Sequence, residues 1–465
     1  MEKVRLGFIP AHRVPFNEDW AVEMRKRTLE ALAGIEEIEV VVPGPELTQN
    51  GLVRDDAEAE KVIGLFEEQG VEGLLLGAMT FGDEISAVSI VENMDVPALL
   101  FGTKEGAFTA DGGRRSDAFC GTLSISSGLY RRKIPFVFSG IRFPEEEEFL
   151  GDVRRFAGTV SAIQAFMGAK IGLVGPRPER FETCGINEYP MIEQFGQRVV
   201  QTSLVDIFGA ARALKDDDPV VTQIVEEIRA RVDCSEASDE AVRKMAKLEQ
   251  ALLEFAEEKG LSGMGIQCWT AMQSDYGISS CTTMGRLTEQ GIMAACEVDI
   301  HGVLSMLAQY RATLGRTVPH FIDWTIQHQE NENAFLAWHC GNAPQCLAAK
   351  NSKPHLRSHS ILGEMLGHEC SQGCAEFQLQ AGTVTFNRLV EYDGEFRMLI
   401  TKGEIVPSDQ ELRGSWSWVE VPSLEILYRT LVEQGFTHHA SMIHGDVTEE
   451  LTDFCMFLGI EAVIV

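Results

Sequence analysis

The stretch Val4-Arg-Leu-Gly-Phe-Ile9 is a short, mostly apolar run that is typical of a buried strand. A helical pattern follows it, and the same alternation continues through the first third of the chain. The apolar runs are 4–9, 38–42, 73–77 and 97–101, and helical patterns cover 19–32 and 57–69. Because the strands of a parallel sheet are buried on both faces and are joined by helices, this pattern predicts a doubly wound α/β domain.

Two loops of this domain are candidate parts of a binding site. Ligands of doubly wound sheets bind beyond the carboxyl ends of the strands. The loops Pro10-Ala-His-Arg13 and Met79-Thr-Phe-Gly-Asp83 follow two of the predicted strands. We therefore predict that these two loops are parts of a pocket.

The alternation resumes after an acidic run at 144–148, and one long helical stretch is expected over 220–259. The pattern changes character near residue 316. From there, apolar and polar residues alternate with period two, as in 382–389. Such segments, separated by turn residues, predict an antiparallel sheet or barrel. Since 465 residues exceed one compact core, we predict two doubly wound, Rossmann- or flavodoxin-like domains at 1–150 and 151–315. A mainly antiparallel β-barrel domain at 316–465 is expected to follow them.

The composition excludes several classes of partner. A formal charge of −30 and a pI near 4.8 describe a strongly acidic protein, whose surface repels phosphate backbones, so we expect no nucleic-acid partner. No signal peptide is recognisable and no apolar run is long enough to span a bilayer, so we expect a cytoplasmic protein without a membrane partner. The eleven cysteines are then expected to be reduced thiols.

Three segments carry side chains that can bind a metal ion. Ala295-Cys-Glu-Val-Asp-Ile-His-Gly302 contains two acids and a histidine, with Glu297 expected at the N-terminus of the following helix. Pro319-His-Phe-Ile-Asp323 places another acid at the end of a short apolar strand, and Thr437-His-His439 places paired histidines after a helix. Each segment alone is ordinary, because acids often cap helices and paired histidines often lie on the surface. Together they suit Mn²⁺, Mg²⁺ or Co²⁺, with positions left open for substrate oxygens.

In order and spacing, these motifs resemble those of the L-fucose isomerase and L-arabinose isomerase superfamily. The stretch Glu297-Val-Asp299 resembles the family's metal-binding glutamate motif, and Asp323 follows Glu297 by 26 residues, as the second acid of the family does. The second histidine is the ligand in the family's terminal motif, which selects His439 here. Gln267 resembles a substrate-contacting glutamine, and His339 resembles the histidine that follows the second acid in arabinose isomerases. The resemblance runs from the first predicted strand to the last residues.

The resemblance implies a metal-dependent aldose–ketose isomerase that works by an ene-diol route. Glu297, Asp323 and His439 would hold the cation, for which Mn²⁺ is the first expectation and Mg²⁺ or Co²⁺ are alternatives. Glu297 and Asp323 would also move the proton between C2 and C1 of the open-chain sugar. The substrate is expected to be a pentose, a 6-deoxyhexose or a substituted hexose.

The remaining expected contacts of the sugar follow from the same resemblance. Gln267 and Trp269 would line the sugar pocket, and His339 would be either an oxygen contact or a fourth ligand. Arg13 and Phe81 would close the site from another domain or subunit. Members of the family form hexamers or other cyclic assemblies, so we expect a homo-oligomer, hexameric or trimer-based.

Several alternatives stay open at this point. A non-catalytic sugar-binding or regulatory protein could share the fold, although binding alone needs no set of metal ligands. An oxidoreductase is disfavoured because the glycine fingerprint of dinucleotide-binding folds is missing. Asp299 reads equally as a helix cap, as a support for a ligand or as a ligand. The residues that would identify the sugar lie in loops that match neither L-fucose isomerase nor L-arabinose isomerase. Arg13, Arg114 and Arg115 could accept an anionic sugar.

Overall fold

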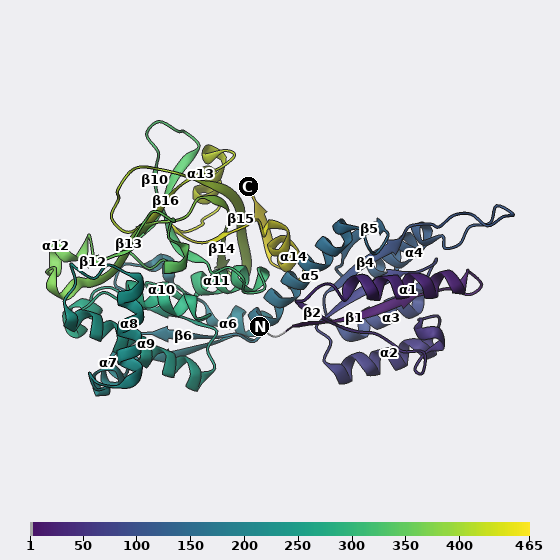
Figure 1. The fold of residues 1–465 in the computed structure, drawn as a ribbon, viewed down its shortest axis with the longest axis horizontal. Coiled ribbons are helices and arrows are strands. Elements are labelled where there is room, and N and C mark those ends of the chain that lie inside the picture. The colour runs from purple at the N-terminus through teal and green to yellow at the C-terminus, as the bar shows by residue number, and fades with distance from the viewer. Residues whose placement is uncertain (1–2) are drawn as a thin grey trace. The chain divides into compact units, whose positions relative to one another are not determined.

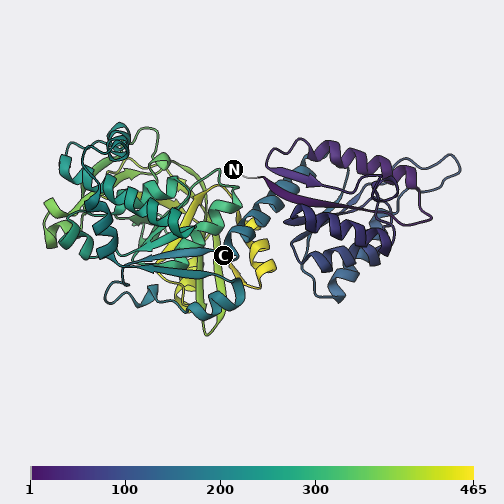
Figure 2. The ribbon, with the colours of Figure 1, turned by 90° about the horizontal axis from the view of Figure 1, so that it is seen from below.

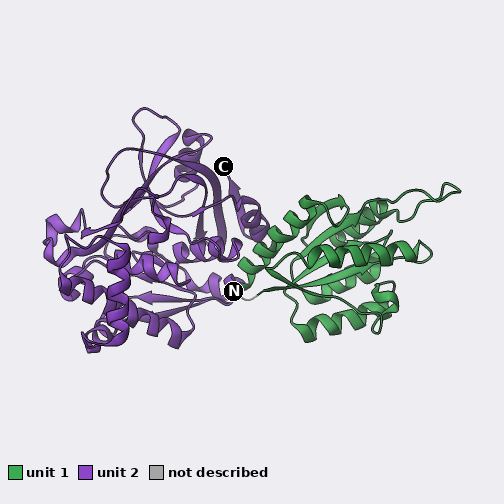
Figure 3. Cartoon of the chain, in the orientation of Figure 1, with its two compact units in different colours: residues 1–164, 456–459 green, residues 165–455, 460–465 purple. Residues whose placement is uncertain are grey.

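The computed structural model describes residues 3–465. Its contacts divide the chain into two compact units (Figure 3). Unit 1 comprises the described residues up to 164 together with 456–459, and unit 2 comprises 165–455 and 460–465. The finer partition at residues 150 and 315 remains a prediction. Within residues 3–465, no helix combines the length and the apolar composition of a membrane span.

Unit 1 is built on a five-stranded parallel sheet with helices on both faces (Figures 1 and 2). The strand order β2-β1-β3-β4-β5 is the flavodoxin-like order, whose build-up reverses direction between β1 and β3. The predicted doubly wound parallel sheet of the N-terminal part is thereby confirmed. The strands are β1 (Val4–Ala11), β2 (Ile38–Val41), β3 (Gly73–Ala78), β4 (Ala98–Thr103) and β5 (Val137–Arg142), and the helices are α1 (Glu18–Leu32), α2 (Asp56–Gln69), α3 (Glu84–Met94), α4 (Ala118–Arg131) and α5 (Glu147–Phe166).

Unit 2 contains a second parallel sheet, of four strands in the order β7-β6-β8-β9. Its strands are β6 (Lys170–Val174), β7 (Arg198–Thr202), β8 (Gly263–Ile266) and β9 (Met293–Cys296). The accompanying helices are α6 (Glu188–Phe195), α7 (Leu204–Ala213), α8 (Pro219–Arg231), α9 (Asp239–Lys259), α10 (Cys281–Glu289) and α11 (Ile300–Ala312). The helical stretch expected over 220–259 is split into α8 and α9, because the Ser238 side chain accepts a hydrogen bond from the Ala241 N–H and starts a new helix.

A nine-stranded mixed sheet completes unit 2, in the order β12-β13-β16-β11-β10-β17-β14-β15-β18. Two pairs, β13/β16 and β15/β18, are parallel and the others are antiparallel. The strands are β10 (His320–Gln327), β11 (Ala334–His339), β12 (His355–Ser358), β13 (Gln372–Gln378), β14 (Gly382–Tyr392), β15 (Glu395–Val406), β16 (Ser415–Glu420), β17 (His439–His444) and β18 (Glu461–Ile464), and the helices are α12 (Leu362–Leu366), α13 (Leu424–Glu433) and α14 (Thr448–Leu458).

Helix α11 joins the two sheets of unit 2. It contacts β8 and β9 of the parallel sheet and also β10, β14 and β17 of the mixed sheet. Eleven of its thirteen residues are buried, because it is covered from both sides. This packing fixes the turn that precedes α11 between the carboxyl end of β9 and the strands of the mixed sheet.

Candidate metal centre

The turn between β9 and α11 has an unusual backbone conformation. Glu297 (φ 57°) and Val298 (φ 60°) are both left-handed, which is uncommon for a residue with a side chain and rare for a β-branched one. The helix itself begins later: Asp299 is its N-cap, and its Oδ1 accepts a hydrogen bond from the Gly302 N–H at 2.8 Å. Glu297 therefore lies in the strand-to-helix turn and not at the helix N-terminus, where the sequence had suggested it.

Gly265 of β8 makes room for this turn. A Cβ atom at position 265 would lie 2.8 Å from the carbonyl carbon of Val298 and 2.9 Å from its Cα. The turn therefore crosses β8 in direct contact with its backbone. Strain at a functional turn is retained only where the surrounding structure holds it in place, and here β8 and α11 do so.

Two neighbouring strands of the mixed sheet supply the second acid and the histidine. Asp323 of β10 pairs directly with His439 of β17 in antiparallel register, and side chains of such directly opposite residues lie close together. Asp323 had been expected at the end of its strand, but it lies in the interior of β10. The strand continues because β10 keeps pairing with β11 as far as Gln327.

The two predicted acid ligands both approach the imidazole of the third, His439. The Nε2 atom of His439 lies 2.7 Å from Oε2 of Glu297 and 3.5 Å from Oδ1 of Asp323. Glu297 and His439 are buried, whereas 23% of the Asp323 side chain is exposed. The acid that faces outward thus leaves the centre accessible to a ligand from one side.

Four polar atoms at this point are buried with incomplete hydrogen bonding within the described chain. Oδ1 of Asp323 and Nε2 of His339 have no hydrogen-bond partner, and Nε2 of His439 and Oε2 of Glu297 have only their contact with each other. Each unpaired buried polar group costs about 1–3 kcal/mol, so this group of atoms indicates a site that is completed by a bound group. Carboxylate oxygens and imidazole nitrogens are ligands of Mn²⁺ and similar divalent ions. The donor set therefore fits the predicted cation.

The charges of the centre are strongly coupled. Burial tends to raise the pKa of Glu297, but the hydrogen bond and charge of His439 outweigh it and lower that pKa below its usual value. Burial raises the pKa of Asp323 to about 7, with the charge of Glu297 adding to the rise. Burial opposes charging of His439, yet its contacts with Asp299, Cys184 and Glu297 raise the pKa of the imidazole well above its usual value. Without a metal ion, a proton on His439 takes the place of a cation between the acids.

His339 is the last residue of β11 and is neutral. Its Nδ1 accepts a hydrogen bond from the Cys340 N–H at 2.9 Å. Burial lowers the pKa of His339 to about 3, so the ring is neutral. A neutral imidazole with an accepting Nδ1 carries its proton on Nε2. The atom of His339 that has no partner is therefore an N–H donor.

Two other predicted pocket residues lie at the carboxyl edge of the parallel sheet. Gln267 follows β8, which pairs in parallel with β9, the strand that leads to Glu297. The Nε2 of Gln267 donates to the carbonyl oxygen of Trp269 at 3.2 Å. The Trp269 ring packs against the buried His359 ring, with centroids 5.9 Å apart. Their contact with a sugar remains a prediction.

The structure also brings in residues that the sequence analysis missed. Arg388 of β14 is buried, and its Nη1 lies 2.5 Å from Oδ2 of Asp299. Cys184 places its Sγ 3.9 Å from Nδ1 of His439. An arginine inside the apolar run Phe386-Asn-Arg-Leu-Val390 was the available signal for Arg388; a lone cysteine carried no signal.

Arg13 and Phe81 lie in unit 1, at the edge where β1 and β3 end. The guanidinium carbon of Arg13 lies 5.1 Å from the centroid of the Phe81 ring, and its Nη1 lies 3.0 Å from Glu84. Beside them, Nδ1 of His12 lies 2.8 Å from Oγ1 of Thr80. The two predicted loops thus meet at the switch point of the strand order, and the role of Arg13 and Phe81 as substrate contacts remains a prediction.

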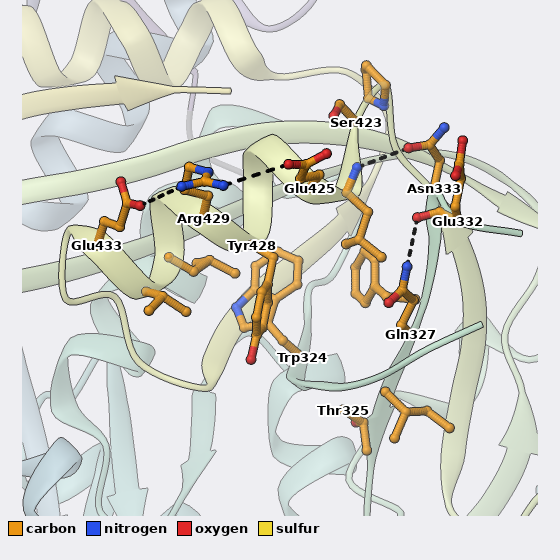
Figure 4. A pocket seen from close by; sticks show the side chains of 16 residues that line it. Trp324, Thr325, Gln327, Glu332, Asn333, Ser423, Glu425, Tyr428, Arg429 and Glu433 are labelled. Carbon is orange, nitrogen blue, oxygen red and sulfur yellow. Dashed lines mark hydrogen bonds and ion pairs between the residues drawn. The ribbon is translucent and has the colours of Figure 1, made fainter. Parts of the chain in front are cut away.

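Unit 2 also contains a cavity that lies apart from the metal centre. The cavity, of about 920 Å³, lies between β10, the following hairpin and α13 (Figure 4). Its polar side chains are mostly engaged with one another: Gln327 donates to the Glu332 carbonyl, and Arg429 is paired with Glu433 and Glu425. Of the described residues that line it, none belongs to the metal centre.

Comparisons with known proteins bear on both ends of the chain. Residues 7–167 match the family described as fucose/sulfoquinovose isomerase, N-terminal domain, and residues 337–465 match L-fucose isomerase, C-terminal domain. The chain belongs to the L-fucose and L-arabinose isomerase superfamily. Together the two matches cover more than half of the 465 residues. The resemblance inferred from the motifs is thereby confirmed.

Relatives in this superfamily match almost the whole chain. A sulfoquinovose isomerase of Alkalicoccus urumqiensis is 28% identical over 96% of both chains. A sulfoquinovose isomerase of Priestia megaterium is 26% identical over 99% of both. An L-arabinose isomerase of Bacillus subtilis is 21% identical over 80% of this chain and 74% of its own. The predicted enzyme class, an aldose–ketose isomerase of sugar metabolism, is confirmed.

Proposed function

We propose that this isomerase is metal-dependent and interconverts sulfoquinovose, a 6-sulfo aldose, with the corresponding 6-sulfo ketose. The approach of Glu297 and Asp323 to Nε2 of His439, among buried atoms with incomplete hydrogen bonding, supports the dependence on metal. The names of the relatives that match nearly full length support the sulfonated substrate. It is the anionic member of the substituted hexoses considered from the sequence.

The cation would be held by Oε2 of Glu297, Oδ1 of Asp323 and Nε2 of His439, with Mn²⁺ as the first candidate. When bound, it would polarise the sugar carbonyl and offset the negative charge that develops on O1 and O2. The acids also balance the charge of the centre. With Glu297, Asp299 and Asp323 ionised and Arg388 protonated, two negative charges remain for one divalent ion.

The reaction moves one proton from C2 to C1 and one proton from O2 to O1, while the carbonyl moves from C1 to C2. This transfer needs a carboxylate within hydrogen-bond reach of both carbons. Asp323 is the acid of the centre with an exposed portion, so we assign the transfer between carbons to Asp323. Glu297, which is buried against His439, serves to hold the centre and to keep its charge fixed.

We assign His339 to the sugar and not to the metal. A ligand must present a lone pair, but Nε2 of His339 carries the proton as long as Nδ1 accepts from Cys340. If the proton were on Nδ1 instead, the Nδ1–H of His339 would point at the Cys340 N–H, and the hydrogen bond between them would be lost. An Nε2–H aimed into the centre suits a hydroxyl or carbonyl oxygen of the open-chain sugar.

Replacing His339 by alanine is therefore expected to lower kcat/KM by about 10²–10³, as for the loss of one oriented donor. Mn²⁺ affinity should change by less than about threefold, because no ligand is lost. Manganese titration followed by electron paramagnetic resonance, together with steady-state kinetics, measures both. Loss of Mn²⁺ binding would show that His339 is a ligand instead.

A panel of sugars tests the proposed substrate. Purified enzyme supplied with Mn²⁺ is offered sulfoquinovose, D-glucose, L-fucose and L-arabinose at equal concentrations, and ketose formation is followed. We expect a kcat/KM for sulfoquinovose at least about a hundredfold above that for glucose, because a site built for a charged group rejects the analogue that lacks it. Equal or better turnover of a neutral sugar would overturn the substrate assignment but leave the isomerase class in place.

Three further expectations belong to this proposal. The strand pairing supports the predicted β-barrel: β15 also pairs with β16, so the pairings return on themselves through β16, β11, β10, β17, β14 and β15. We propose a homo-oligomer, hexameric or trimer-based, on the strength of the family resemblance. A cytoplasmic location and the absence of nucleic-acid and membrane partners remain predictions from composition.

A further inference from the structure

A buried guanidinium lies directly behind the metal centre. The Arg388 side chain is 1% exposed, and its Nη1 lies 2.5 Å from Oδ2 of Asp299. The same Oδ2 lies 2.8 Å from Nδ1 of His439, and Oδ1 of Asp299 accepts from the Gly302 N–H. Both carboxylate oxygens of Asp299 are therefore already engaged. Arg388, Asp299 and His439 form a connected row that ends at the Nε2 atom facing Glu297.

Burying these charged side chains costs folding free energy. Burying a charged arginine is unfavourable unless it is paired, and a buried ion pair often contributes little net stability. A positive charge so close to a cation site also opposes binding of the cation. The pair is therefore poorly explained as a device for stability or for attracting a metal ion.

The geometry points to a positioning role: Asp299 accepts a hydrogen bond from Nδ1 of His439, so that the Nε2 lone pair faces the cation, and the ion pair with Arg388 holds the Asp299 carboxylate in that place. This inference rests on the proposed metal centre and deepens it. Carboxylates that orient a ligating histidine in this way typically change metal affinity by about 10- to 100-fold.

Metal affinity and stability separate this role from a merely structural ion pair. Mn²⁺ dissociation constants and thermal midpoints are measured for Asp299→Asn, Arg388→Met and the double variant, starting from metal-free protein. We expect Asp299→Asn to weaken Mn²⁺ binding by about 10- to 100-fold. Arg388→Met should lower the thermal midpoint, because Asp299 is left buried without its partner. The double variant should regain much of that midpoint, since no unpaired charge remains, but it should not regain Mn²⁺ affinity.

A second buried pair provides the matched control. Arg286 of α10 is 5% exposed and its Nε lies 2.6 Å from Oε2 of Glu249, which is 1% exposed. Arg286→Met should lower the thermal midpoint and change Mn²⁺ affinity by less than about threefold. Recovery of Mn²⁺ affinity together with stability in the Asp299→Asn/Arg388→Met protein, or unchanged affinity in Asp299→Asn, would overturn the positioning role.

One more variant separates the positioning role of Asp299 from the proposed metal centre on which it rests. Glu297→Gln removes a proposed ligand and leaves the row of Arg388, Asp299 and His439 intact. If Glu297→Gln binds Mn²⁺ as the wild type does, the metal centre itself is wrong. If Glu297→Gln loses Mn²⁺ while Asp299→Asn binds normally, only the positioning role fails. Should Arg388→Met not fold, the near-isosteric Asp299→Asn still decides the outcome.

Discussion

Replacing Glu297 by glutamine, or Asp323 by asparagine, is expected to abolish sugar isomerisation while leaving the fold intact. Each change removes a negative charge from a centre in which carboxylate oxygens lie 2.7 Å and 3.5 Å from Nε2 of His439. For Asp323→Asn the proposed proton carrier is also lost, so we expect kcat to fall by at least about 10³, the combined scale of general-base and electrostatic contributions. Circular dichroism and kinetics on the two purified variants check the result.

The stability of these variants provides an internal control. Burial raises the pKa of Asp323 to about 7, so Asp323→Asn should unfold within a few degrees of the wild type. Glu297→Gln also loses the charge that pairs with His439, so it should unfold at a somewhat lower temperature. An unfolded Glu297→Gln protein would assign a structural role to that residue. Near-normal turnover in both variants would remove Glu297 and Asp323 from the active site.

Gly265→Ala is expected to have the second large effect, although residue 265 carries no chemistry. The added Cβ would meet the backbone of Val298 at 2.8 Å. Backbone cannot yield as a side-chain end does, so the turn that aims Glu297 must shift. Overpacking of this kind costs about 1–3 kcal/mol, and misplacement of a reacting group by about 1 Å costs about 10² in rate. We expect both a lower thermal midpoint and at least a hundredfold loss of kcat/KM.

A second glycine in unit 2 is a suitable control for that substitution. Gly209 lies within α7, and an added Cβ there would meet nothing within 4 Å. Gly209→Ala should therefore leave activity unchanged and raise stability by about 0.5–1 kcal/mol, the usual gain in a helix interior. Wild-type kinetics in Gly265→Ala would mean that the turn between β9 and α11 tolerates displacement and does not position Glu297.

The sequence predicted the parallel sheet of unit 1 well because its strands are buried on both faces. Leu74, Leu75 and Leu76 of β3 are fully buried, for example, and such a run leaves few alternatives. The single helical stretch expected over 220–259 was wrong because its composition stays helix-like across the break. Helix α8 ends at Arg231, and the capping by Ser238 then begins α9.

The candidate site was predictable where its residues lie in short contiguous motifs. Glu297, Asp323 and His439 were found in this way, and the structure places them together. The left-handed turn at Glu297 and Val298 was not predictable, since no glycine or asparagine marks it. Arg388 contacts Asp299 across 89 residues, and that contact depends on how β14 packs against α11, which no local pattern encodes.

The most direct test of the account is a Mn²⁺ titration of metal-free enzyme with ketose formation from sulfoquinovose as the readout. Treatment with EDTA followed by dialysis should remove the activity, and Mn²⁺ should restore it at one ion per chain. In Glu297→Gln the same titration should restore no activity and show Mn²⁺ binding weakened by at least tenfold. Full activity in the metal-free enzyme, or Mn²⁺ binding that is unaffected by Glu297→Gln, would contradict a metal centre at Glu297, Asp323 and His439.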